Sequence, residues 1–203
     1  MVKMSKKIYS AGLVSQRFWF YEMKQYIELL NEGKNDEEIK ILSAEVNIFG
    51  AVSQGRAKEI YRGTKRRVDS LGKELQELFP QLNIDNQKIV SLISVFLVND
   101  LFLEFMLEVF QAQIQKEQLF LTSKDYKSFF SEKQRTNDVV ASWKPYTYHR
   151  LGSAYRTYLL ESGLLREEKE KDIITPKMLD QRVTMYLKSI NRLDIVKSIT
   201  GGI

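Results

Sequence analysis

The chain has no cysteine and only one histidine, His149, among its 203 residues. Without cysteine it can form no disulfide, zinc knuckle or thiol nucleophile. A single histidine excludes a two-histidine metal site, and any catalytic triad would have to use His149. The sequence also lacks a GxSxG turn, a phosphate loop ending in GK[ST] and a GxGxxG motif after a strand. We therefore expect no enzyme activity, no cofactor and no metal.

A large excess of charge is also missing. The 31 lysines and arginines exceed the 26 acidic residues by five, and 43% of the residues are hydrophobic. This composition is typical of a soluble globular protein, and the small positive excess favours an acidic partner only weakly. The length lies between one large domain and two small ones. We expect an N-terminal domain at residues 1–83 and a second region at residues 84–203, separated after Pro80.

Uninterrupted apolar stretches are scarce near the N-terminus. Lys3, Lys6 and Lys7 are followed by Tyr9 and Ser10, where a signal peptide needs a continuous apolar region. We therefore expect no secretion and a cytoplasmic location, which agrees with the absence of cysteine.

One apolar run, from Ile89 to Phe110, is long enough to span a bilayer. Asp100, Glu104 and Glu108 interrupt it, and an acidic group near a membrane centre costs on the order of 3 kcal/mol. We expect a central pair of buried helices instead, with the break at Asn99 or Asp100, and no membrane contact.

The stretch from Arg56 to Lys73 carries the clearest functional pattern. Its apolar side chains recur at helical steps and predict one buried face: Ala57, Ile60, Tyr61, Thr64, Val68 and Leu71. An adjoining face carries Lys58, Arg62, Lys65, Arg66 and Lys73. A row of cations on one side of a helix gives successive phosphates a partner, although most charged helix faces are merely solvated. We take Lys58, Arg62, Lys65, Arg66 and Arg67 as candidate phosphate contacts.

The basic helix follows two other helices with short connections. A first helix is expected over Gln16 to Asn31, and Asn35 with Glu38 forms a capping-box start for the second. Ser53 is placed to cap the third, basic helix. This order is typical of a helix-turn-helix unit, although the match is generic.

The C-terminal part predicts a winged-helix-like region. Ser123 is placed to cap one helix, Thr136 to Lys144 reads as a loop, and Pro145 begins a helix that ends near Gly163. Two short apolar runs, Leu164-Leu165 and Ile173 to Thr175, then predict a short β-hairpin. Its tip, Arg166 to Asp172, contains four acids and three bases, a poor composition for approaching DNA. A last helix is expected from Pro176 to Asn191.

The helix after Pro145 offers a second cationic surface. Arg150 and Arg156 share its polar side with His149, so we take both arginines as a second group of candidate DNA contacts. Most aromatic residues fit helical apolar stripes and therefore the core. Trp143 and Tyr146, in the preceding loop, are the exceptions that favour surface contacts.

Several segments together resemble the BrxA family of small accessory proteins in bacterial BREX phage-defence systems. They run over nearly the whole chain: Tyr9 to Leu13, Arg17 to Phe20, Asn35 to Ile39, Ser53 to Leu71, Leu101 to Phe105, Phe129-Phe130 and Leu159 to Leu165. The resemblance implies a mostly helical, all-α cytoplasmic protein that binds double-stranded DNA. It also implies other BREX components as partners, and it supplies no catalytic residues.

Three functions stay open at this point. The first is binding of double-stranded DNA mainly through its phosphate backbone, for which four or five contacts predict a slope of roughly −4 in log affinity against log salt. The second is a protein scaffold in the defence complex that docks its basic faces on acidic partners. The third is a nuclease with an acidic cluster, which predicts cleavage dependent on Mg²⁺.

Overall fold

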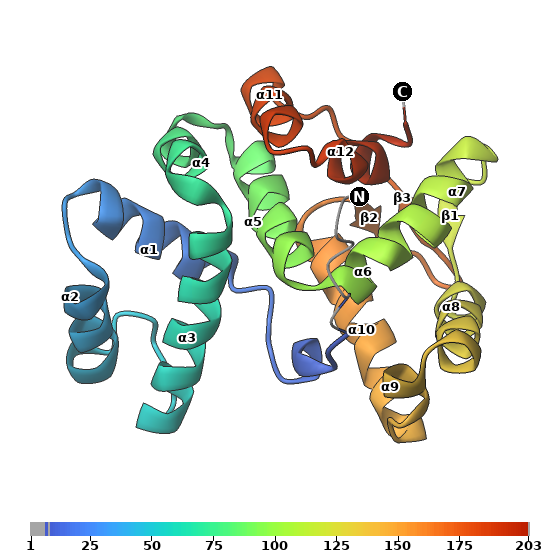
Figure 1. Cartoon of the computed structure of the whole chain (residues 1–203), viewed down its shortest axis with the longest axis horizontal. Coiled ribbons are helices and arrows are strands. Elements are labelled where there is room, and N and C mark those ends of the chain that lie inside the picture. The colour runs from blue at the N-terminus through green and yellow to red at the C-terminus, as the bar shows by residue number, and fades with distance from the viewer. Residues whose placement is uncertain (1–6, 8, 203) are drawn as a thin grey trace, which may run out of the picture.

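The computed structural model describes residue 7 and residues 9–202. The fold is mostly helical with one small sheet, as expected from the sequence. The N-terminal part contains η1 (Gly12–Val14), α1 (Phe20–Asn31), α2 (Asp36–Ile41), η2 (Leu42–Val46), α3 (Gln54–Ser70), α4 (Gly72–Leu78) and η3 (Phe79–Gln81). Of these, α1, α2, α3 and α4 lie on the left of Figure 1. The proposed boundary after residue 83 stays a prediction.

Local chemistry fixes the basic helix α3. The Ser53 side chain accepts a hydrogen bond from the Arg56 N–H and caps the first turn, as predicted. Every residue of the predicted apolar stripe is buried. The prediction of one continuous helix as far as Lys73 is wrong, because Gly72 adopts a φ of 70° that breaks the chain direction. Lys73 therefore lies on α4.

The first helix begins later than predicted. It starts at Phe20 rather than Gln16, because Trp19 has a left-handed φ of 54°. The Asn35 capping box of α2 is present as predicted, with the Glu38 carboxylate accepting from the Asn35 N–H at 2.8 Å. Residues 9–19, which we call the strap, consequently run outside α1 and cross from α10 to α3 (Figure 1).

The central apolar run forms two elements, as predicted. These are α5 (Ile84–Val98) and a continuous helical run made of α6 (Asp100–Phe105), η4 (Met106–Phe110) and α7 (Gln111–Gln115). Asn99 caps the second element by accepting from the Phe102 N–H at 2.9 Å. The two elements are bent by 114° at this break, and within residues 9–202 no single helix is long and apolar enough to cross a membrane.

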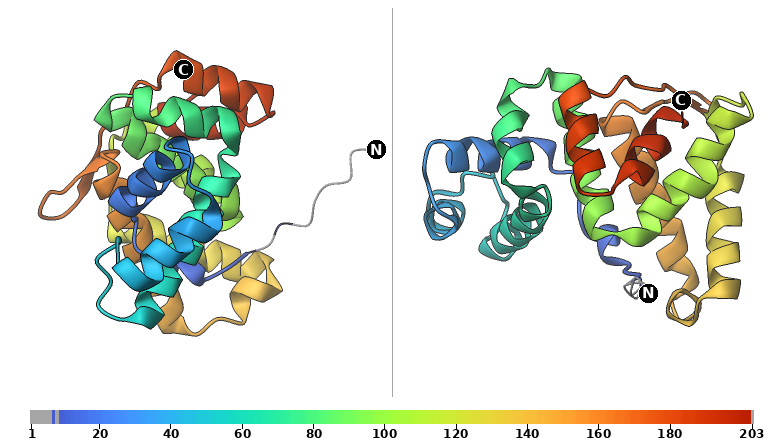
Figure 2. Two further views of the ribbon diagram at one scale, coloured as in Figure 1. Left: turned by 90° about the vertical axis from the view of Figure 1, so that its left-hand side faces the viewer. Right: turned by 45° about the horizontal axis from the view of Figure 1, so that its top comes forward.

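The C-terminal part contains the sheet. Its elements are β1 (Phe120–Leu121), α8 (Ser123–Thr136), α9 (Asp138–Ala141), α10 (Pro145–Glu161), β2 (Leu165–Arg166), β3 (Asp172–Ile174), α11 (Gln181–Ser189) and α12 (Leu193–Thr200). The strands are antiparallel in the order β1-β3-β2, so the predicted hairpin is confirmed and β1 is an addition. The hairpin projects from the body of the molecule (Figure 2).

Three predicted details of this part are wrong. Thr122, not Ser123, is the N-cap of α8, where its capping box with Asp125 satisfies the first turn. The expected loop from Thr136 to Lys144 contains the short helix α9, capped by Asn137. The last predicted helix, α11, begins at Gln181 rather than Pro176 and ends at Ser189, and a further helix that was not predicted, α12, follows it.

Buried side chains from both parts form one core cluster. Its centre is aromatic: Phe102 of α6 stacks on Tyr155 of α10 with centroids 4.1 Å apart, and Phe105 stacks on Tyr126 of α8 at 4.9 Å. Aromatic pairs of this kind add stabilisation to the area that they bury. The core therefore fixes α8 and α10 against the central helical run, and most aromatic residues serve packing, as predicted.

A buried carboxylate ties the strap to this core. Glu104 of α6 accepts hydrogen bonds from Lys133 at 2.5 Å and from Lys7 and Tyr9 at 2.7 Å. Burial alone raises the pKa of Glu104, but the hydrogen bonds from Lys133, Lys7 and Tyr9 outweigh it and leave the pKa lowered.

Candidate nucleic-acid interface

Three of the candidate contacts form an open row on α3. Lys58, Arg62 and Arg66 are exposed and follow one another at four-residue steps. The row therefore extends about 12 Å along the helix at roughly 1.5 Å per residue. Within the described residues, none of the three has a carboxylate at ion-pair distance. Their internal contacts are with carbonyls only: Arg62 with Lys58 O at 3.3 Å and Arg66 with Val98 O at 3.1 Å.

Lys65, on the same helix, forms ion pairs with two acids. Its ammonium lies 2.6 Å from Asp36 of α2 and 2.8 Å from Asp69 of α3. Partial burial alone lowers the pKa of Lys65, but hydrogen bonds to Asp36 and Asp69 outweigh this effect and raise the pKa to about 12. Lys65 thus remains charged, but its charge is balanced within the protein. A phosphate would have to compete with both carboxylates for it.

Arg67 does not belong to the surface, which corrects its place among the candidate contacts. Its side chain is 2% exposed. The guanidinium donates to Arg17 O and Phe18 O at 3.1 and 2.6 Å, and to Gln16 Oε1 and Tyr158 Oη at 3.0 and 2.9 Å. It also lies over the ring of Trp19, 5.1 Å from its centroid. Arg67 therefore fastens the strap to α3 and α10, and has no free donor face for DNA.

The two arginines of α10 have different environments. Arg150 is exposed, donates to Val14 O at 2.8 Å and faces no carboxylate at ion-pair distance within the described residues. Arg156 is bound by Asp172 at 2.6 Å and by Glu167 at 2.7 Å. Hydrogen bonds to these two carboxylates raise the pKa of Arg156. The expectation of a second patch therefore reduces to Arg150, since Arg156 is used to fasten the hairpin to α10.

The strap brings α3 and α10 to one surface. Arg56 of α3 donates to Ser15 O at 3.3 Å, next to the Val14 carbonyl that accepts from Arg150. Arg56 also pairs with Glu59 at 2.7 Å and lies over Trp19 at 5.4 Å. The sequence pattern missed this junction because residues 16–19 were expected to be helical. The i, i+3 spacing of Arg56 and Glu59 was the only local signal that this cation is partly balanced.

Tyr146 lies in the first turn of α10 rather than in the expected loop, and of Tyr146 and Trp143 only Tyr146 is fully at the surface. This residue is 69% exposed, and the Arg150 guanidinium lies over the Tyr146 ring, 5.8 Å from the centroid of the ring. Trp143 is half-buried against Tyr148 at 6.2 Å. His149 is exposed on α10, where it faces a groove that lies beside α8. Among residues 7 and 9–202, no group of three or more histidine, aspartate or glutamate side chains is arranged to hold a metal.

Comparison with known proteins identifies the family. The family model described as BrxA matches residues 7–191. A protein of Bacillus cereus (strain H3081.97) named "BREX protein BrxA" is 32% identical over 190 residues, which cover 94% of each chain. The fold is also similar to the crystal structure of an uncharacterized protein from Magnetospirillum magneticum. That similarity has a TM-score of 0.77 at 17% identity, over 95% of this chain and 98% of the other.

The family model extends over the strap, α3 and α10, which together form the cationic surface. The solved structure, at its low identity, supports the fold alone. The chain belongs to the BrxA family of accessory proteins in BREX phage-defence systems.

Proposed function

We propose that this protein binds double-stranded DNA through the phosphate backbone, as a non-catalytic accessory protein of its defence system in the cytoplasm. The observation that carries the proposal is the unbalanced row of Lys58, Arg62 and Arg66, with Arg150 beyond the strap. Cations that are not balanced by acids gain most from phosphates and release most counterions. Four contacts of this kind predict a slope of about −3.6 in log affinity against log salt.

The topology of the C-terminal part adds to this proposal. A helix, a short strand, a helix pair and a hairpin, with strand order β1-β3-β2, follow the layout of a winged helix. We propose that α8 to α10 with the hairpin form such a unit, and that α1 to α3 form the helix-turn-helix-like one. The hairpin tip carries Glu167, Glu168 and Glu170, which repel phosphates. DNA therefore contacts α3 and the strap side of α10 rather than the tip.

The test compares two triple variants with the same loss of charge. The first replaces Lys58, Arg62 and Arg66 by glutamine. The control replaces Lys40, Lys73 and Arg135, which are exposed but paired with Glu37, Glu77 and Glu132. We expect the first variant to reduce the salt slope from about −3.6 to about −0.9, because each phosphate contact contributes roughly 0.9. The control variant should keep both its affinity and its slope.

Two results would contradict the proposal. An equal loss in both variants would mean that only net charge matters and that the row has no special role. Mg²⁺-dependent cleavage of the duplex by the purified protein would make it a nuclease rather than a non-catalytic binder. Both measurements use a labelled duplex of random sequence, because backbone contacts carry no sequence information.

A further inference from the structure

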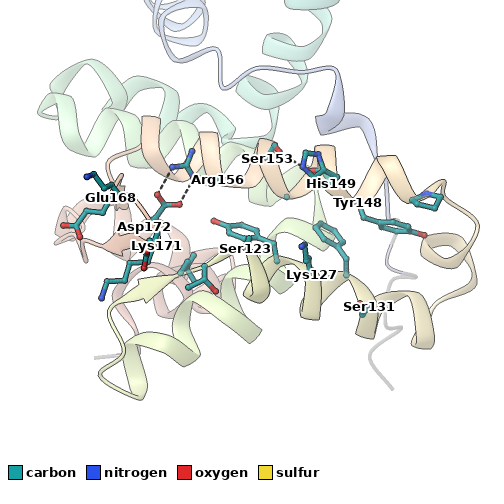
Figure 3. A pocket seen from close by; sticks show the side chains of 18 of the residues that line it. Ser123, Lys127, Ser131, Tyr148, His149, Ser153, Arg156, Glu168, Lys171 and Asp172 are labelled. Atoms are coloured by element: carbon teal, nitrogen blue, oxygen red, sulfur yellow. Dashed lines mark hydrogen bonds and ion pairs between the residues drawn. The ribbon is translucent and has the colours of Figure 1, made fainter.

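A groove of about 940 Å³ lies between α8 and α10, on the side of α10 away from the strap. The hairpin loop, with Glu168 to Asp172, closes one end of it (Figure 3). Its α8 wall extends from Ser123 to Gln134, about 16 Å at roughly 1.5 Å per residue. This length corresponds to about three helical turns.

The two walls of the groove have the spacing of helix packing surfaces. Tyr126, Phe130 and Gln134 of α8 line it at four-residue steps, as do Tyr148, Gly152 and Arg156 of α10. The grooves between ridges at this spacing accept the ridges of another helix. The outer rims carry short, exposed side chains, Ser123 and Ser131 on α8 and Ser153 on α10, above a floor of largely buried rings. Figure 3 shows these three serines along the groove.

The α8 rim of the groove carries a cation that no acid of the described residues balances, Lys127. Lys127 on the α8 rim and His149 on the α10 rim are both exposed. Among the described residues, neither has a carboxylate at ion-pair distance, and neither helical rim contributes an acid to the lining. The acids of the groove are confined to the hairpin, where Asp172 is already bound by Arg156. An occupant between the two helices therefore gains from carrying negative charge.

The floor contains a buried hydroxyl that has no partner. Tyr126 is 8% exposed, and its hydroxyl makes no hydrogen bond with any described residue. A buried donor without an acceptor costs roughly 1–3 kcal/mol. Burial and the nearby Asp172 raise the pKa of Tyr126, so the hydroxyl keeps its proton.

We propose that this groove binds an acidic amphipathic helix of another protein of the defence system. The helix places its apolar face on Tyr126, Phe130 and Tyr148, and its carboxylates toward Lys127. Helix-in-groove recognition of this kind reads apolar anchors at three- and four-residue steps. The site is separate from the proposed DNA surface, which uses α3 and the strap side of α10. A partner can therefore occupy the groove while DNA is bound.

The first experiment is site-specific cross-linking in the full chain. A photoreactive amino acid replaces Ser131 or Ser153 on the rims, or Ser189 on α11 as the control, during co-expression with the other proteins of the defence system. We expect the two rim positions to cross-link to one segment with acids and apolar residues at helical spacing, and the control position not to. Cross-links between copies of this chain, or none to any of these proteins, would overturn the proposal.

The second experiment tests charge and occupancy. Lys127→Glu leaves the fold intact because the side chain is exposed, and Ser153→Trp fills the groove; Ser189→Trp is the matched control. Both groove variants should reduce co-purification of the cross-linked partner at least tenfold, with DNA affinity within twofold of the unmodified chain for Ser153→Trp. An acid-to-lysine change in the partner segment should restore binding to Lys127→Glu. Failure of this rescue would overturn the proposal, as would loss of DNA binding in Ser153→Trp. Loss of DNA binding only in the triple glutamine variant of Lys58, Arg62 and Arg66 does not contradict the groove proposal.

Discussion

Replacing Arg67 by alanine is expected to destabilise the protein, whereas the same change at the neighbouring Arg66 should leave stability almost unchanged. Arg67 is 2% exposed and makes four hydrogen bonds to the strap and to Tyr158. Arg66 is exposed and makes one contact, with Val98 O. The two changes remove the same charge and the same atoms at adjacent positions of one helix. Any difference between them comes from burial.

The structure sets the size of the effect. In the Arg67→Ala variant Arg17 O still accepts from Tyr158, whereas Phe18 O and Gln16 Oε1 lose the hydrogen bonds from Arg67. Losing a hydrogen bond to a charged group costs roughly 1.5–3 kcal/mol. Two such losses lower the free energy of unfolding by about 3–6 kcal/mol. In a chain of this size, each kcal/mol of lost unfolding free energy lowers Tm by about 2–4 °C. The Arg67→Ala variant should therefore lose at least about 6 °C in Tm.

Urea unfolding followed by circular dichroism measures both variants at pH 7. Arg66→Ala should remain within about 0.5 kcal/mol of the unmodified chain, as is usual for surface changes. Arg67→Lys keeps the charge but cannot span four acceptors with one nitrogen. Its unfolding free energy should therefore lie between those of Arg66→Ala and Arg67→Ala. Equal stability of Arg66→Ala and Arg67→Ala would refute the buried position of Arg67. Weaker DNA binding by Arg67→Ala without lower stability would refute it as well.

Three further changes test the packing around the strap and the central helices. Stability contributed by Glu104, whose pKa is lowered, is present above its ordinary pKa of 4.5 and is lost as the pH falls below that value. Urea unfolding of Glu104→Gln should therefore show a weaker decline below pH 4.5 than the unmodified chain, and an equal decline would contradict this. Asn99→Ala removes a buried cap and should lower the unfolding free energy by about 1–2 kcal/mol. An unchanged unfolding free energy would contradict the cap. Gly63→Ala places a methyl group against the Trp19 ring and should cost roughly 1–3 kcal/mol in thermal unfolding, whereas a stabilised variant would place Trp19 elsewhere.

Helical periodicity predicted most of the elements because each helix buries one face. The stripe of α3 is an example, and it also held the signal for Arg67. This residue follows Ile60 and Thr64 at helical steps, on the buried side, but its charge alone suggested a surface role. Long-range pairing left no such signal. Lys65 meets Asp36 from another helix, and Arg156 meets Asp172 sixteen positions later, so neither balance follows from local spacing.

The shortest elements were missed for a related reason. The strand β1 consists of Phe120 and Leu121 only, too short to show an alternating pattern, and it exists because β3 pairs with it. The strap escaped prediction because its aromatic residues also fit a helical pattern. The left-handed Trp19 is held by cation–π contacts with Arg56 and Arg67. The groove between α8 and α10 likewise depends on tertiary packing rather than on any one segment.

The most direct test of the proposed function is the affinity of the purified protein for a random-sequence duplex, measured at several salt concentrations. The open row on α3, together with Arg150, predicts a slope of about −3.6 in log affinity against log salt, at roughly 0.9 per phosphate contact. A slope near zero, or no binding at low salt, would contradict backbone recognition by these cations.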